Sequence, residues 1–180
     1  MTTELIQPPT KLGPKGLELV KQEEGFRASL YLDAVGVVTV GFGHAVKDPQ
    51  TKLLLRGDEG MKRARSQFPN PLSVEKAESL LREDLEEFEK NVFDLTKACE
   101  FRLTQEMFDA LVSFDYNTGS LGKSTLIKKI RAGDFVGAAQ EFDKWVLGTV
   151  GGKKVKLKGL VRRRGREKAL FLEGVTLLNR

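Results

Sequence analysis

The sequence predicts an α+β fold in which a small strand lobe is followed by a long helix and a bundle of helices. Three observations lead to this prediction. Residues 29–44 alternate around several glycines, which is typical of a small antiparallel sheet. From residue 73 onward, apolar residues recur every three or four positions, as in amphipathic helices. The 180 residues, 40% of them hydrophobic, suit one globular domain.

The chain is predicted to begin with a loose lead-in over residues 1–15, where Pro8, Pro9 and Pro14 disfavour helix. This segment lacks the apolar stretch of a secretory signal. A single domain is expected over residues 16–180. Its first element is a short helix over residues 16–24, which Gly25 ends.

The strand lobe is predicted to occupy residues 25–72. Its sheet lies within residues 29–44, because the glycines there allow tight turns between short strands. Residues 45–72 show no clear period and are expected to be irregular.

A connecting helix is predicted over residues 73–92, with Ser73 as its N-cap. It leads into a helical lobe over residues 93–180. Further helices in that lobe are expected after the caps Thr104 and Ser124, over residues 135–146, and as a basic helix over residues 160–172 that ends at Gly174. A fold with two lobes predicts a ligand site in a cleft between them.

Composition excludes several classes of site. The single cysteine, Cys99, allows no internal disulfide, and the single histidine, His44, allows no Cys/His metal cage. No G-x-G-x-x-G motif is present, so no dinucleotide site is indicated. No stretch approaches the ~20 apolar residues of a membrane span. We therefore expect a monomer without metal or cofactor.

Positive charge is concentrated in residues 153–168, which hold nine Lys or Arg residues and one Glu. This concentration indicates an anionic partner, for which the bacterial envelope and nucleic acid are two candidates. A solvated helix face is an equally simple explanation. Nucleic acid is disfavoured, because no aromatic residues interleave the basic ones and no binding motif is present.

Three polar residues near the predicted sheet could form a catalytic site. Glu24 ends a helix, whose partial negative charge favours the protonated carboxyl of a general acid. Asp33 lies at a turn, where backbone donors can keep it ionised, and the Thr39 hydroxyl could hold a water. Inverting glycoside hydrolysis needs an acid, a base and a positioned water. Each residue alone is more often structural, so the spacing by itself leaves both interpretations open.

The pattern E-x8-D-x5-T, formed by Glu24, Asp33 and Thr39 and followed by V-G-F-G-H, resembles the active-site signature of the bacteriophage lysozymes (endolysins, muramidases) of glycoside hydrolase family 24. Downstream, DALVSFDYNTG, STLIKKIRAGDFVGAAQEFDKWV and GLVRRRGREKALFLEG resemble the family's helical bundle. The resemblance covers Gly16 to Gly174 and implies a lysozyme-like fold.

The resemblance also implies an activity. The enzyme would cut the β-1,4 bond between N-acetylmuramic acid and N-acetylglucosamine in peptidoglycan, causing host cell lysis. Glu24 would be the acid, Asp33 the base or charge stabiliser, and Thr39 the residue that positions the water. Two alternatives remain: a lytic transglycosylase, or a non-catalytic module that binds membranes or nucleic acid through its basic segment.

The chain departs from the family in two places. Its insert over residues 45–71 is longer than in compact members. It also lacks the N-terminal apolar anchor of members that reach the envelope unaided. The resemblance then implies that the protein waits in the host cytoplasm until a separate pore-forming protein, a holin, admits it to the periplasm. The holin is not expected to bind it directly.

Other residues are weaker candidates. Tyr31, Tyr116 and Asn117 are expected to contact substrate. Asp84 falls in the apolar stripe of the connecting helix, where an unpaired charge would be unfavourable. A structural ion pair between Asp84 and His44 would explain both residues.

Overall fold

The computed structural model describes residues 8–99 and 101–178. Their contacts divide the chain into two compact units, one of residues 21–86 and one of residues 1–20 and 87–180. Helices α1 (Pro14–Glu24) and α3 (Val74–Thr96) contribute residues to both units. The strands and the helices are both present as the sequence predicts, so the α+β class is confirmed.

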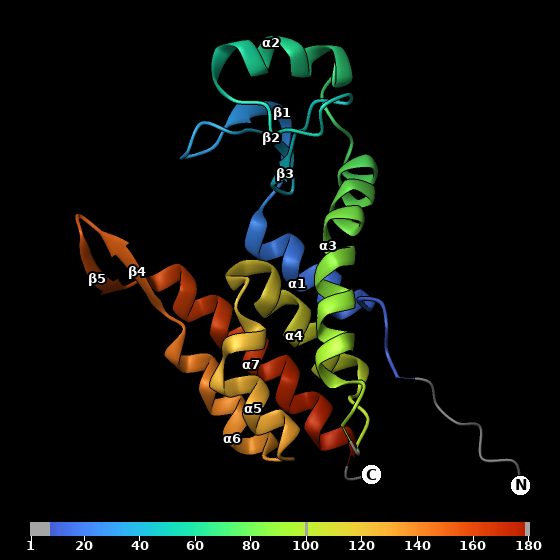
Figure 1. The fold of residues 1–180 in the computed structure, drawn as a ribbon, viewed down its shortest axis with the longest axis vertical. Helices are drawn as coiled ribbons and strands as arrows, with labels where there is room; N and C mark the ends of the chain where they lie inside the picture. The colour runs from blue at the N-terminus through green and yellow to red at the C-terminus, as the bar shows by residue number, and fades with distance from the viewer. Residues whose placement is uncertain (1–7, 100, 179–180) are drawn as a thin grey trace, which may run out of the picture. The chain divides into compact units, whose positions relative to one another are not determined.

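The unit of residues 21–86 is built on a three-stranded antiparallel sheet in the order β1-β2-β3 (Figure 1). The strands are β1 (Arg27–Leu32), β2 (Val38–Gly41) and β3 (His44–Ala45). Gly25 ends α1 as predicted: it has a φ of +71°, and its N–H donates to the Lys21 carbonyl at 3.0 Å. The predicted small sheet is therefore confirmed.

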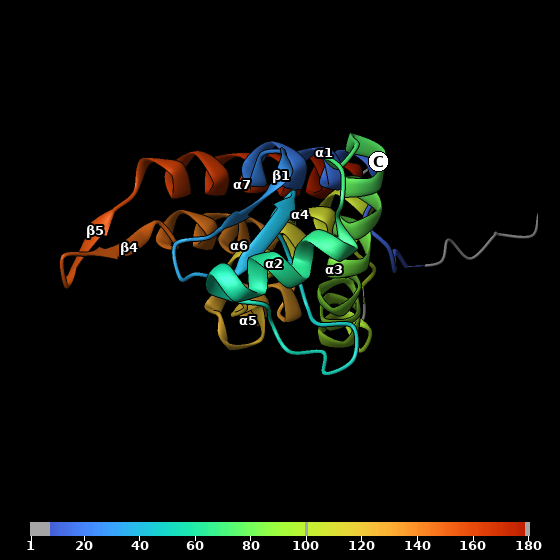
Figure 2. The ribbon, with the colours of Figure 1, turned by 90° about the horizontal axis from the view of Figure 1, so that it is seen from above.

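Residues 45–72 are not irregular, because they contain helix α2 (Gly57–Gln67), which contacts β1 and β2 (Figure 2). The helix packs on the core of this unit through Met61 and Ala64, with Phe68 just past its end. Gly60 lies against the chain that enters the helix, since a Cβ there would lie 2.8 Å from the Leu55 carbonyl carbon. So few apolar residues in a short helix give little of the periodic signal on which the prediction relied.

The core of this unit lies between the sheet and its helices. Its buried members come from β2, from the chain around β3, from α2 and from the first turns of α3: Val38, Val40, Val46, Leu55, Ala64 and Leu80. Helix α3 starts at the predicted cap, where the Ser73 Oγ accepts the Lys76 N–H at 3.2 Å. The helix runs four residues beyond the predicted end, to Thr96.

The second unit is mainly helical, and α4 packs against α7. It comprises α4 (Gln105–Thr118), η1 (Leu121–Lys123), α5 (Thr125–Arg131), α6 (Phe135–Glu141), η2 (Phe142–Lys144) and α7 (Lys158–Leu178). Both predicted caps are confirmed. Thr104 accepts the Met107 N–H, and Ser124 accepts the Ile127 N–H.

Two predictions about this unit are wrong. Pro14 is the first residue of α1, because proline at the first helical position loses no hydrogen bond. Gly174 lies inside α7 instead of ending it. The predicted basic helix over residues 160–172 is confirmed as part of α7. Before it lies an antiparallel hairpin that was not predicted, formed by β4 (Leu147–Val150) and β5 (Lys153–Lys156). Its turn is Gly151–Gly152, a pair that favours two-residue hairpin turns.

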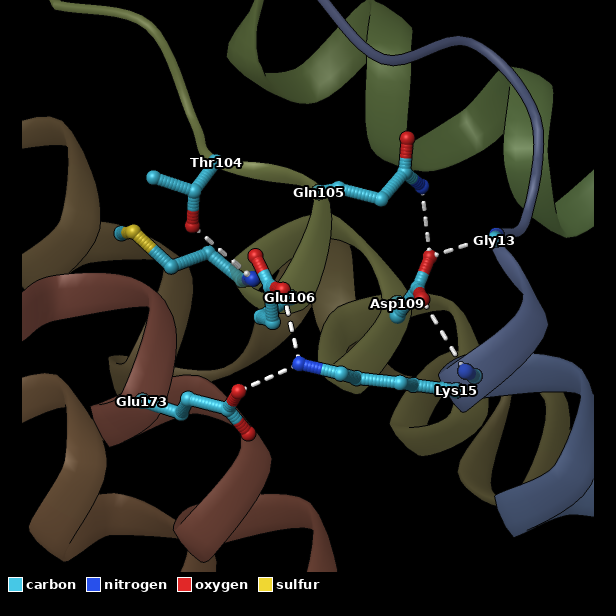
Figure 3. Close-up of polar contacts among 9 residues, drawn as sticks. Gly13, Lys15, Thr104, Gln105, Glu106, Asp109 and Glu173 are labelled. Atoms are coloured by element: carbon cyan, nitrogen blue, oxygen red, sulfur yellow. Dashed lines mark hydrogen bonds and ion pairs between the residues drawn. The ribbon is translucent and has the colours of Figure 1, made fainter. Parts of the chain in front are cut away.

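The start of α1 is held by a carboxylate from α4 (Figure 3). Asp109 accepts the N–H groups of Gly13 and Gly16, at 2.9 and 3.0 Å, and the side-chain amide of Gln105 at 2.7 Å. Lys15 pairs nearby with Glu106 and Glu173. Part of the predicted loose lead-in is therefore ordered by long-range contacts that the sequence does not reveal.

Candidate functional site

The three candidate catalytic residues all lie in the unit of residues 21–86. Glu24 is the last residue of α1 and is half-buried. Its Oε2 lies beside Gly43, where an added Cβ would be 3.8 Å away. Gly43 has a φ of +85°, which side chains rarely adopt. The positive φ explains the glycine, and the contact places the Glu24 carboxylate directly beside the turn that Gly43 forms.

Asp33 lies in the turn between β1 and β2, and one of its carboxylate oxygens shapes that turn. Oδ1 accepts the N–H groups of Val35 at 2.9 Å and Val37 at 2.8 Å. Within the described part of the chain, Oδ2 has no hydrogen-bond partner. One oxygen is thus fixed by the backbone, and the other is available to accept a proton.

Thr39 lies on the central strand β2 and is 4% exposed. Its hydroxyl donates to the Val37 carbonyl at 3.1 Å, so its lone pairs remain to accept a hydrogen bond, for example from a water. It pairs with Tyr31 of β1 and with Ala45 of β3. Directly paired strand residues share a face of the sheet, so Tyr31 and Thr39 are neighbours.

The sheet thus gathers the sequence candidates of this unit. Tyr31 and Thr39 are cross-strand partners, Asp33 closes the hairpin that joins their strands, and Glu24 lies beside the Gly43 turn that joins β2 to β3. A carboxyl that can donate, a carboxylate that can accept and a hydroxyl that can hold water make up the groups needed for acid–base hydrolysis.

His44 and Asp84 lie together, as the pairing prediction requires. The His44 Nδ1 is 2.9 Å from Asp84 Oδ2 and 3.1 Å from Oδ1, and the imidazole contacts the ring of Phe68. Both side chains are partly exposed, at 20% and 30%. The contact joins β3 to α3 inside this unit.

Tyr116 and Asn117 belong to the other unit, at the end of α4. The Tyr116 ring meets Phe88 edge-on at a centroid distance of 5.2 Å. The Asn117 Oδ1 accepts a hydrogen bond from Arg164. Asn117 also lines an open groove of about 470 Å³, together with Thr118, Lys144, Trp145, Leu147, Lys154 and Leu160.

Sequence reasoning missed a buried charge cluster in α7. Arg163, Arg164 and Glu167 are all less than 5% exposed, and Ser113 of α4 donates to Glu167 Oε1 at 2.8 Å. Arg163 and Arg164 lie 3.1 and 2.9 Å from the Glu167 carboxylate. Burial raises the pKa of Glu167, and the two arginines oppose that shift. The spacing of the arginines, three and four residues before Glu167, was the available signal.

Within residues 8–99 and 101–178, no group of three or more His, Cys, Asp or Glu residues could hold a metal ion. No helix there is long and apolar enough to cross a membrane.

Comparison with known proteins identifies the family. A family model described as phage lysozyme matches residues 21–167, which include Glu24, Asp33 and Thr39. The chain belongs to the phage lysozyme family. This phage lysozyme is 37% identical over 162 residues to the endolysin of Acyrthosiphon pisum secondary endosymbiont phage 1, covering 89% of this chain and 97% of that one.

Two further relatives agree. The endolysin of Bacillus phage B103 is 39% identical over 163 residues, covering 88% of this phage lysozyme but 53% of that protein. The muramidase domain of SpmX from Asticaccaulis excentricus superposes with a TM-score of 0.71 at 32% identity, covering 90% and 97% of the two chains. The predicted lysozyme-like fold is confirmed, and the protein is a lysozyme-type hydrolase of the endolysin kind, an enzyme of cell lysis.

Proposed function

We propose that this phage lysozyme hydrolyses the β-1,4 bond between N-acetylmuramic acid and N-acetylglucosamine in peptidoglycan, with inversion at the anomeric carbon. The observation that carries the proposal is the position of the Glu24 carboxylate beside the Gly43 turn of a sheet whose strands and hairpin turn bear Thr39 and Asp33. The muramidase domain among its structural neighbours supports the choice of substrate.

In this mechanism Glu24 donates its proton to the glycosidic oxygen as the bond to the anomeric carbon breaks. A water held by the Thr39 hydroxyl attacks that carbon from the opposite face, and Asp33 Oδ2 takes the proton that the water loses. Inverting enzymes leave room for this water by separating the two carboxyl groups by ~6.5–9.5 Å. We predict a separation in that range for Glu24 and Asp33.

Substrate contacts are proposed for Tyr31, Tyr116 and Asn117. Tyr31 lies beside Thr39 on the sheet, so it could stack on the sugar that is cleaved. Tyr116 and Asn117, which belong to the other unit, are proposed to contact the glycan or its peptide. The enzyme would act as a monomer without metal or cofactor, reaching the wall after a holin opens the membrane.

The decisive experiment replaces Glu24 with Gln, which keeps the side chain's size but removes the transferable proton. Hydrolysis of purified peptidoglycan should fall by ~10²–10⁴-fold. Glu23→Gln is the matched control, because it makes the same change one residue earlier on α1, and it should keep parental activity. Circular dichroism checks that both variants fold. A Glu24→Gln variant with more than about a tenth of parental activity would refute the general-acid role.

A lytic transglycosylase is the second candidate, since it would use the same acid, with a hydroxyl of the sugar as the attacking group. Asp33 and Thr39 favour hydrolysis by water, because transglycosylation would need neither a base nor a hydroxyl that positions a water molecule. Mass spectrometry of the products separates the two: hydrolysis gives a reducing sugar, and transglycosylation gives an anhydro-sugar.

We also propose that residues 153–168 hold the enzyme to the anionic bacterial envelope. The four lysines at positions 153, 154, 156 and 158 support this, because all are exposed and none has an ion-pair partner in the described part of the chain. A non-catalytic protein acting only through this segment would lyse cells equally well with Glu24→Gln, so a cell-lysis assay of the same variant tests that alternative.

A further inference from the structure

The basic segment divides into two parts that differ in their availability for binding. In α7, Arg163 and Arg164 are buried against Glu167, and Lys168 pairs with Asp143 at 2.6 Å. Each of these cations already has a carboxylate partner within the protein. The lysines on β5 and at the start of α7 are exposed and lack such partners in the described chain. Free positive charge is therefore concentrated at the hairpin.

The hairpin also exposes apolar side chains beside those lysines. In its register Leu147 pairs with Lys156, and Val150 pairs with Lys153. Leu147 is 54% exposed, Val150 57% and Val155 37%. Each face of the ribbon thus carries at least one exposed aliphatic side chain within reach of a lysine.

The tip of the hairpin can approach a surface closely. Gly151 and Gly152 form the turn, with φ values of +55° and +78°, and no atom lies within 4 Å of a Cβ placed on either. Both views show β4 and β5 projecting beyond the helices of their own unit (Figures 1 and 2). Val150, which is next to the turn, therefore lies at the projecting end.

We propose that the β4–β5 hairpin docks on an anionic phospholipid bilayer. Lysines extend their ammonium groups to lipid phosphates while their stems and neighbouring aliphatic side chains enter the interface. A soluble polyanion would use the lysines alone and would leave Val150 and Val155 exposed to water. This proposal rests on the proposed action at the envelope and assigns the attachment to a strand ribbon instead of the basic helix.

The test measures co-sedimentation of the full chain with vesicles of phosphatidylcholine alone or mixed with phosphatidylglycerol. The hairpin variant replaces Lys153, Lys156 and Lys158 with Gln; Lys154 is kept because it lines the groove beside Asn117. The control replaces Lys47, Lys76 and Lys123, which are equally exposed and unpaired in the described chain. Both variants lose the same charge.

The parent should bind only the phosphatidylglycerol vesicles, and less so at about 0.5 M salt. The hairpin variant should bind them more than about tenfold more weakly, because each lysine near an anionic surface contributes about fivefold. The control should stay within about twofold of the parent. Val150→Ser should weaken binding without changing its salt dependence.

Equal binding by the hairpin and control variants would overturn the proposal, as would parental binding to phosphatidylcholine alone. A third result would also overturn it: the parent sediments with lipid-free cell walls or DNA but not with vesicles, and the hairpin variant loses that sedimentation. The lysines would then bind a wall polymer or nucleic acid. Hydrolysis of lipid-free peptidoglycan should be the same in all three proteins. If the parent itself did not hydrolyse lipid-free peptidoglycan, the proposed function would be refuted, independently of the membrane proposal.

Discussion

Thr39 and Asp33 each combine a structural bond with a free chemical group. Thr39 donates its proton to the Val37 carbonyl, and Asp33 Oδ1 accepts the Val37 N–H, so both side chains are fixed by the same residue. Groups held this way need little reorganisation when a reaction begins. The resemblance of their pattern to the family's signature predicted that they belong to one site. The identity of the free oxygen, Asp33 Oδ2, depends on the turn geometry and was not predictable.

The His44–Asp84 contact provides a prediction about a single side chain. Asp84→Asn keeps the shape of the side chain but removes the charge that faces the His44 Nδ1. Because the pair is partly exposed, the free energy of unfolding should fall by about 0.5–2 kcal/mol, between the values typical of surface and buried pairs. Urea unfolding at pH 6 measures it.

Glu83→Gln is the control for this change, since Glu83 is the exposed neighbour of Asp84 on α3 and has no ion-pair partner in the described chain. Its unfolding free energy should match the parent within about 0.5 kcal/mol. Equal stability of the two variants would show that the His44–Asp84 contact contributes nothing to the fold.

Among whole elements, the best predicted are those with explicit caps and a regular apolar period. Helices α3, α4 and α5 begin at Ser73, Thr104 and Ser124 because each side chain accepts a backbone N–H. Helix α2 was missed because only Met61 and Ala64 within it pack on the core, which is too few for a clear apolar period. The hairpin was missed because its strands are short, exposed and rich in lysine. They lack the alternating apolar pattern that would have given the Gly151–Gly152 turn its meaning.

Helix α7 offers two glycines with opposite expected effects. A Cβ at Gly174 would lie 2.8 Å from the Met107 backbone nitrogen of α4, whereas one at Gly165 meets nothing within 4 Å. Gly174→Ala should therefore destabilise by about 1–3 kcal/mol through overpacking. Gly165→Ala should stabilise by about 0.5–1 kcal/mol, because alanine favours helix. Thermal unfolding of both variants measures this, and a stabilising Gly174→Ala would contradict the close packing of α4 and α7.

For the molecule as a whole, contacts between distant parts of the sequence are what the sequence conceals. Asp109 lies more than ninety positions from Gly13 and Gly16, whose N–H groups it accepts. No local pattern around Asp109 predicts this role. The concentration of positive charge in residues 153–168 could be seen in the sequence. The burial of two of its arginines against Glu167 in α7 could not be predicted from it.

Asp109 should also influence how stability depends on pH. Burial raises the pKa of its carboxyl above the ordinary value of 3.8, against the hydrogen bonds that lower it. Its contribution to stability is therefore fully present below pH 3.8 and is lost as pH rises through the raised folded pKa. The unfolding free energy of the parent, measured relative to that of Asp109→Asn, should therefore decrease from pH 3 to pH 7.

Asp94→Asn should behave in the opposite way. Hydrogen bonds from Lys90 and Lys97 lower the pKa of Asp94 to about 2. The contribution of this carboxylate is present above pH 3.8 and is lost as pH falls through about 2, so the parent's advantage should grow toward neutral pH. Urea titrations across the pH range measure both slopes. Slopes of the same sign for the two variants would contradict the role of burial at Asp109.

The only histidine and the only tryptophan of the sequence lie in different units: His44 on β3 and Trp145 against Phe114 in the helical unit. The protein therefore carries a natural spectroscopic label in each half. Tryptophan fluorescence reports the helical unit alone, and the imidazole proton resonances of His44 report the strand unit alone. Following both signals through one denaturant titration reveals whether the two halves melt together, with no dye, tag or substitution introduced.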